Sequence, residues 1–242
     1  MNSSSPAIQI DHLKFSWVKN TPLTLDVDHF SVQPGEHVFL KGESGSGKST
    51  LLNLLGGVLV PNSGKITLLD QSLTNLNSTQ RDVFRSNHIG FIFQMFNLLP
   101  YLSVLENVTL PLSFSNDRKN RTLKKQNIND EAMRLLAHLN LDDPSLLSRS
   151  VSELSVGQQQ RVAAARALMG TPEIIIADEP TSSLDSDHRD NFINLLTSEC
   201  RQNQSTLLFV SHDQSLERHF DRTLSLSDIN NAQTNKSAVG LN

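Results

Sequence analysis

The chain has 242 residues, which is enough for one large domain or two closely joined lobes. A hydrophobic content of 37% and a charged content of 19% are typical of a globular protein, and a formal net charge of −4 gives no overall attraction to nucleic acid or anionic lipid. Cys200 is the only cysteine, which excludes an intrachain disulfide and suits a reducing compartment. The sequence shows neither a signal-peptide pattern nor an apolar run long enough to cross a bilayer, so we expect any membrane role to come through a partner.

The first 40 residues contain short β-type runs at 7–10, 13–18, 23–30 and 37–40, with a Pro34-Gly35 turn before the last run. They predict an antiparallel β layer that leads into the next motif. Residues 64–69 and 88–94 are further strand candidates.

Residues 42–49, Gly-Glu-Ser-Gly-Ser-Gly-Lys-Ser, fit the phosphate-binding pattern G-x-x-x-x-G-K-[ST]. Glycines let backbone N–H groups curl around an anion, Lys48 adds a mobile positive charge, and the Ser49 hydroxyl can bind Mg²⁺. A strand candidate precedes the loop and a helix follows it, ended by Gly56-Gly57 and Pro61. The helical spacing is carried by Leu51, Leu54, Leu55, Val58 and Leu59. The alternative, a plain Gly/Ser turn, needs all three features to coincide by accident.

Residues 95–170 have helical periodicity, for example Val104, Val108 and Leu112 on one face. Residues 115–129 are polar and basic without periodicity, and we expect a surface loop there. Because no aromatic residues interleave with its basic ones, a solvated face is favoured over a nucleic-acid site.

The βα alternation returns at residue 173. An apolar strand over 174–177 ends in Asp178 and Glu179, whose side chains alternate in direction and therefore serve different tasks. By analogy with phosphoryl-transfer sites, we assign Asp178 to Mg²⁺ and Glu179 to the water that attacks the γ-phosphate. An acidic strand end before a turn at Pro180 is the alternative. A helix over 186–200 and a strand over 206–210 follow, which predicts an α/β fold with a covered parallel sheet and a polar tail at 230–242.

Ser155 and Gln158 form an S-x-x-Q capping box at the start of an alanine-rich helix. The same residues, with Gly157 between them, could instead bind a phosphate at the helix N-terminus. The sequence pattern alone leaves both interpretations open.

The order of motifs resembles the ATP-binding subunit of an ABC (ATP-binding cassette) transporter over roughly residues 8–228. The motifs are the phosphate loop, Gln94, Leu154 to Gln158, 174–181 (Ile-Ile-Ile-Ala-Asp-Glu-Pro-Thr), 182–185 (Ser-Ser-Leu-Asp) and His212. The resemblance implies a P-loop NTPase fold. It would have a RecA-like, mostly parallel core lobe (1–94 and 171–229), an N-terminal antiparallel β layer and an inserted α-helical subdomain (95–170).

The resemblance also implies roles for individual residues. Two copies would bind two ATP molecules head to tail, the signature of one copy completing the site of the other. Gln94, Glu179 and His212 would act in hydrolysis, and Asp185 would lie at the dimer seam or, equally, cap the following helix. Nucleotide contacts would come from Trp17 (with Phe15 as the alternative for stacking on adenine), Gly42, Glu43, Ser44, Gly45, Ser46, Gly47, Lys48, Ser49 and Thr50. The signature in trans would be Ser155, Val156, Gly157 and Gln158, and Mg²⁺ would take Ser49, Gln94 and Asp178.

Two residues depart from the family pattern. Val156 stands where glycine is commonest, which stiffens the loop but keeps Ser155 and Gly157. Trp17 stands where tyrosine is more usual and offers a larger stacking face.

Residues 90–100 and 103–111 resemble the subgroup that serves lipoprotein release, macrolide export and cell-division complexes. This implies a second copy of the chain and an integral membrane permease as partners, no nucleic acid, and a cytoplasmic location on the inner face of the membrane. The alternatives are a soluble ABC ATPase acting on ribosomes or DNA, and a regulatory cassette that rarely turns over.

Overall fold

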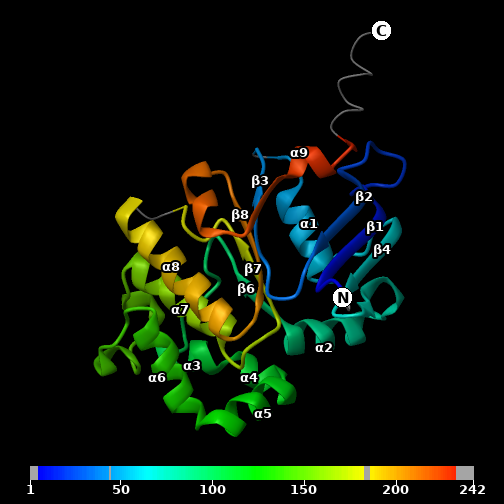
Figure 1. Ribbon diagram of the computed structural model, residues 1–242. Coiled ribbons are helices and arrows are strands. Elements are labelled where there is room, and N and C mark those ends of the chain that lie inside the picture. The colour runs from blue at the N-terminus through cyan, green and yellow to red at the C-terminus, as the bar shows by residue number, and fades with distance from the viewer. Residues whose placement is uncertain (1–4, 44, 183–185, 233–242) are drawn as a thin grey trace. The chain divides into compact units, whose positions relative to one another are not determined.

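The structure, a computed structural model, describes residues 5–43, 45–182 and 186–232 (Figure 1). The chain forms two compact units, Met1–Asp82 with Leu208–Asn242 and Val83–Leu207. The division falls inside α2 (Ser78–His88) and β8 (Thr206–Ser211). Among the described residues, no helix combines the length and apolarity needed to span a bilayer. The predicted lobe boundaries at 95 and 170 stay a prediction.

The first unit contains a four-stranded antiparallel sheet in the order β2-β1-β4-β5. Its other elements include α1, which follows the phosphate loop, and the paired strands β3 and β9. The bounds are β1 Ile8–Phe15, β2 Leu25–Val32, β3 His37–Lys41, α1 Lys48–Leu55, β4 Ser63–Leu68, β5 Gln71–Ser72, η1 Leu73–Asn75, η4 Gln214–His219, β9 Arg222–Ser225 and α9 Leu226–Ile229. The central strand β1 lies beside β2 and β4, with Ile10 opposite Phe30 on one side and Ile66 on the other (Figure 1).

Strand β1 joins the two runs predicted at 7–10 and 13–18. The register with β4 shifts between Asp11 and Lys14, where His12 has a φ of 49°. Such a bulge bends a strand without ending it. A Cβ on Gly64 would lie 2.3 Å from the carbonyl oxygen of His12, so this close approach requires glycine.

Strand β3 corrects one prediction, because it pairs in parallel with β9 (Val38 opposite Arg222) and not with the antiparallel sheet. Phe39 on β3 stacks on Phe209 at a ring distance of 6.0 Å, and both contact Phe220. The predicted helix after the phosphate loop is also shorter than its spacing indicated, since α1 ends at Leu55 and Val58 is 58% exposed.

Asn230, in the stretch predicted as a polar tail, is buried in the first unit. Its side chain accepts a hydrogen bond from the Asp26 amide at 2.9 Å and donates to the carbonyl oxygen of Thr24 at 3.1 Å. This part of the chain therefore packs against the start of β2.

The second unit is built around α7, which packs on β6, α3, α6 and α8. Residues 162–168 of α7 are all buried. Strands β6 and β7 pair in parallel, with Ile89 opposite Ile174. The bounds are β6 Ile89–Ile92, α3 Val104–Thr109, α4 Pro111–Phe114, α5 Asn116–Lys125, α6 Ile128–His138, η2 Pro144–Leu146, η3 Val151–Glu153, α7 Val156–Leu168, β7 Ile174–Asp178 and α8 Ser186–Gln202.

Helix α5 shows that the prediction of a surface loop over 115–129 was wrong. Ser115 caps the helix by accepting a hydrogen bond from the Arg118 amide at 3.0 Å, and the buried face carries Arg118 and Thr122, four residues apart. Arg118 is 3% exposed. Its Nε donates to the carbonyl oxygen of Met169 and its Nη2 to that of Ala167, both at 2.8 Å. Burial lowers the pKa of Arg118, and the nearby charge of Arg121 adds to this. The sequence pattern did not predict α5 because its buried face is formed by a guanidinium and a hydroxyl side chain, which leave no apolar periodicity.

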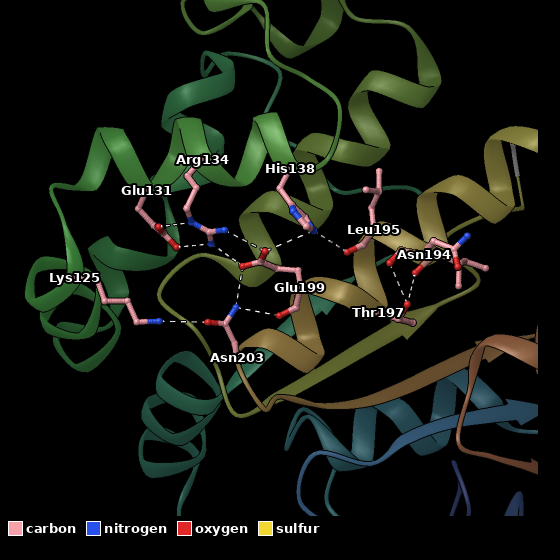
Figure 2. Close-up of polar contacts among 10 residues, drawn as sticks. Lys125, Glu131, Arg134, His138, Asn194, Leu195, Thr197, Glu199 and Asn203 are labelled. Carbon is pink, nitrogen blue, oxygen red and sulfur yellow. Dashed lines mark hydrogen bonds and ion pairs between the residues drawn. The ribbon is translucent and has the colours of Figure 1, made fainter.

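A buried carboxylate, Glu199, joins α8 to α6 (Figure 2). Glu199 is 0% exposed and accepts hydrogen bonds from Arg134 at 2.6 and 3.2 Å, while Arg134 also donates to Glu131 at 2.8 and 2.9 Å. Asn203 donates to Glu199 at 2.8 Å, and a His138 ring nitrogen lies 3.7 Å from it. Burial raises the pKa of Glu199, but the hydrogen bonds and charge of Arg134 outweigh burial, so the pKa lies below its usual value.

We predict that Arg134→Met lowers the free energy of unfolding by about 2–4 kcal/mol at pH 7.5, because it leaves Glu199 charged and buried without its cation. In the wild type, the lowered pKa of Glu199 stabilises the folded state at pH values above 4.5, the ordinary pKa of the carboxyl group. This stabilisation is lost as the pH falls through the pKa of the folded state. In the variant, burial raises the pKa of Glu199, so protonation relieves the penalty and the difference from wild type shrinks toward pH 5. Urea unfolding followed by circular dichroism at pH 7.5, 6 and 5 measures this. The exposed Lys124→Met is the control, and a difference that stays constant with pH contradicts the prediction.

Candidate functional site

The phosphate loop connects β3 to α1, and its glycines adopt conformations that other residues avoid. Gly45 and Gly47 have φ values of 77° and 105°. A Cβ on Gly47 would meet a Leu25 methyl carbon at 3.0 Å, so both strain and space favour glycine there. Gly47 is the N-cap of α1, and its carbonyl oxygen accepts the hydrogen bond of the Leu51 amide at 2.9 Å. The helix therefore begins at the end of the loop, so that the positive end of its dipole faces the loop.

Lys48 is 8% exposed and lies inside the curl of the loop. Its Nζ donates hydrogen bonds to the carbonyl oxygens of Gly42 at 2.6 Å and Glu43 at 2.9 Å. The ammonium is thus held where loop amides and the helix dipole also favour negative charge. Of the next residues, Ser49 is exposed and Thr50 is buried, while Ser44 lies outside the described residues.

A cavity of about 360 Å³ adjoins the loop within the first unit. Gly42, Glu43 and Ser46 line it from the loop side. His212, directly after β8, lines it together with Gln214. The structure therefore brings together the phosphate loop and the histidine that the sequence placed 164 positions after Lys48.

Trp17 and Phe15 differ in accessibility. Phe15 is 5% exposed and belongs to the core, whereas Trp17 is 63% exposed and packs edge to face on Phe15 at 5.3 Å. Only Trp17 of this pair presents a broad aromatic surface to a ligand, which favours it over the alternative.

In the second unit, Gln94 and Glu179 follow the ends of two neighbouring parallel strands, β6 and β7. Ile92 lies opposite Ala177, and Gln94 and Glu179 each follow two residues later. The first four residues of β7 are fully buried, while its last residue, Asp178, and the next residue, Glu179, are half-buried. Glu179 has a φ of 45°, which a non-glycine residue keeps only where its surroundings impose it.

The loop after Gln94 is also held in unusual geometry. Phe96 and Asn97 have φ values of 58° and 50°. Arg166 on α7 donates to their carbonyl oxygens at 2.6 and 2.7 Å, and burial lowers the pKa of Arg166. We did not predict this contact, because in the sequence Arg166 is one charged residue in an alanine-rich helix and nothing indicates that it points inward.

The signature at the start of α7 forms the predicted capping box. Ser155 Oγ accepts from the Gln158 amide at 3.3 Å, and Gln158 Oε1 accepts from the Ser155 amide at 2.9 Å. Ser155 is exposed, Val156 is 49% exposed and Gly157 is half-buried. The helix start is therefore both capped and open to a ligand.

The hydroxyl of Ser49, the amide of Gln94 and the carboxylate of Asp178 are oxygen donors of the kind that Mg²⁺ takes, and Ser49 and Gln94 are exposed. The described residues contain no cluster of three or more His, Cys, Asp or Glu side chains placed for a metal. Taken one by one, these donors are therefore of a kind that suits Mg²⁺, which usually keeps several waters. Asp185 lies outside the described residues.

The comparisons with known proteins agree with this geometry. The ABC transporter family profile matches residues 25–182. The chain is 38% identical over 91% of its length to an uncharacterized ABC transporter ATP-binding protein of Mycobacterium tuberculosis (strain H37Rv), covering 87% of that protein. It is 40% identical over 81% of its length to the lipoprotein-releasing system ATP-binding protein LolD of Psychrobacter arcticus, covering 84% of it.

Solved structures of a cassette, MJ0796, resemble the chain at 32% identity over 90% of its length and 93% of the cassette. One is a dimer in a post-hydrolysis state bound to ADP and Pi, with a TM-score of 0.77. The other is described as the dimeric structure of a bacterial ABC transporter cassette, with a TM-score of 0.76. They confirm the predicted P-loop NTPase fold. The chain belongs to the ABC transporter family, as an ATP-binding cassette with ATPase activity.

Proposed function

We propose that the chain is the ATP-hydrolysing subunit of a complex in which it drives a separate integral membrane permease of the mechanotransmission type. The observation that carries the proposal is the cavity of the first unit, where the phosphate loop and His212 meet. A nucleoside triphosphate suits the glycines of the loop, the helix N-terminus and the lysine. His212 stands where a terminal phosphate could be held. The dimeric state of the MJ0796 cassettes supports a second copy of this chain as a partner.

The residues divide the reaction between them. On binding ATP, the Lys48 ammonium exchanges the carbonyl oxygens of Gly42 and Glu43 for phosphate oxygens, with Trp17 against the adenine. Glu179 accepts the proton of the attacking water, and His212 donates a hydrogen bond to the γ-phosphate. Ser49, Gln94 and Asp178 would hold Mg²⁺, which when bound offsets the charge of the phosphates.

Across the dimer, we infer that Ser155 and Gly157 of one copy contact the γ-phosphate bound to the other. The exposed start of α7, with a hydroxyl, a small residue and free amides, suits this contact. ATP would then close the dimer and hydrolysis would reopen it. Asp185 would lie at the seam.

The permease would dock beside Gln94. Met95 is 81% exposed and Tyr101 is 78% exposed, both in the stretch that resembles the lipoprotein-release subgroup. Large exposed apolar side chains mark interaction sites when they cluster. This partner would place the chain in the cytoplasm, on the inner face of the membrane, and the similarity to LolD favours export or envelope-related work over uptake.

We predict that Lys48→Ala weakens ATP binding by about 10- to 100-fold, the value of one charge-assisted hydrogen bond or slightly more. Titration with a fluorescent ATP analogue measures this, and thermal unfolding checks that the chain stays folded. Lys65→Ala, an exposed lysine on β4, is the matched control. An unchanged affinity of Lys48→Ala for the ATP analogue would contradict the proposal that the nucleotide binds in this cavity.

We expect Glu179→Gln to slow ATP hydrolysis by about two to four orders of magnitude, the usual contribution of a general base, while ATP affinity is retained. Single-turnover hydrolysis of radiolabelled ATP gives the rate. The exposed Asp142→Asn serves as the control carboxylate. A rate equal to wild type would refute the role of Glu179.

The permease is tested by affinity purification of the tagged chain from detergent-solubilised membranes, followed by mass spectrometry. We expect a few-pass membrane protein with a large extracytoplasmic domain, and we expect its loss in a Met95→Glu, Tyr101→Glu double variant that still binds ATP. Val58→Glu, at an exposed apolar residue of the first unit, is the control. Recovery of ribosomal or DNA-repair proteins without a membrane protein would favour the soluble ABC ATPase alternative.

A further inference from the structure

Helix α7 contacts the turn after β7 through one buried side chain. Gln160 is 0% exposed, and its Nε2 donates a hydrogen bond to the carbonyl oxygen of Pro180 at 2.7 Å. Pro180 directly follows Glu179, and the turn closes with the Ser182 amide on the Glu179 carbonyl oxygen at 3.3 Å. The backbone on the C-terminal side of Glu179 is thus held by a donor from another element.

Packing alone does not explain an amide at this position. The Oε1 of Gln160 has no hydrogen-bond partner among the residues that the structure describes, and a buried polar atom without a partner lowers stability. Methionine has nearly the same length and would fill the space without that penalty. What glutamine adds is the N–H group that binds the turn.

The turn needs such support because its backbone is strained. The φ of 45° at Glu179 is unfavourable for a residue with a Cβ and persists only when neighbouring contacts hold it. A relaxed turn would rotate the Glu179 side chain away from its observed direction. The Arg166 contact with the loop after Gln94 shows the same arrangement further along α7.

We propose that Gln160 is a positioning residue for ATP hydrolysis: by binding the Pro180 carbonyl oxygen it fixes the backbone of Glu179 so that the carboxylate meets the attacking water. The inference rests on the role proposed above for Glu179. Gln160 itself touches neither water nor nucleotide. It lies five residues after Ser155, the N-cap of the same helix, so its side chain links the helix of the signature to the turn.

The first experiment compares Gln160→Met with wild type in the full chain. We expect kcat to fall by about 10- to 100-fold, the usual effect of a small misplacement of a reacting group, with little change in the KM for ATP. Gln202→Met, at the exposed end of α8, is the control for the same substitution. An unchanged kcat overturns the proposal.

Gln160→Glu tests whether Gln160 acts as a hydrogen-bond donor or only fills space. Burial raises the pKa of a carboxyl group, so its neutral form donates an O–H to the Pro180 carbonyl oxygen at low pH, and its ionised form repels that oxygen at high pH. We expect the ratio of variant to wild-type kcat to fall between about pH 6 and 9, whereas the ratio for Gln160→Met stays low throughout. A flat ratio for Gln160→Glu contradicts a donor role.

A double-mutant cycle identifies the residue through which Gln160 acts. If it acts through Glu179, Gln160→Met has no further effect on the single-turnover rate in a Glu179→Gln background. An equal fold-loss in both backgrounds overturns the proposal while leaving Glu179 as the base. A wild-type rate in Glu179→Gln alone instead overturns the proposed function, so the two failures are distinguishable.

Discussion

Backbone carbonyl oxygens at the ends of buried strands need hydrogen-bond donors, and long side chains supply them throughout this protein. Lys48 donates to the start of the phosphate loop, Arg166 to the loop after Gln94, and Gln160 to the turn after Glu179. Each of these loops carries residues that we propose act in the chemistry, and none of them continues a strand or helix. The donors are amide or cationic groups that approach from helices, and they keep the loops in conformations that regular secondary structure does not provide.

This way of holding loops explains why α7 is so deeply buried. Its small residues let it pack closely on β6 and on α3, α6 and α8. Two of its long polar side chains, Gln160 and Arg166, are buried and donate to the loops that follow β7 and β6. A helix that only filled the core would not need them. The first turn of the same helix, next to Ser155, is exposed, and it is the part that we propose meets a second copy.

The sequence predicted the elements that follow local rules. Continuous apolar runs gave β7 and β8, the octet with its flanking strand and helix gave the phosphate loop, and the S-x-x-Q pattern gave the capping box. It did not predict α5, because the buried face of α5 is made by Arg118 and Thr122 and has no apolar period. It also did not predict β9, because this strand has only four residues and all of them are half-buried. The contacts of Gln160 and Arg166 depend on which face of α7 meets the sheet, and spacing alone does not determine that.

The capping box at Ser155 has a consequence for how a helix start can also be a binding site. A hydroxyl group carries two lone pairs and one hydrogen, and the helix uses only a lone pair, through the Gln158 amide. The hydrogen remains available to a phosphate oxygen, so the structural and the functional interpretations of Ser155 are not rivals. Aspartate would cap the helix equally well, but it has no hydrogen to give and would repel the phosphate. Among short capping side chains, only a hydroxyl combines neutrality with both abilities on one atom. The γ-phosphate proposed to bind here would therefore restrict the choice of N-cap residue more narrowly than the helix does.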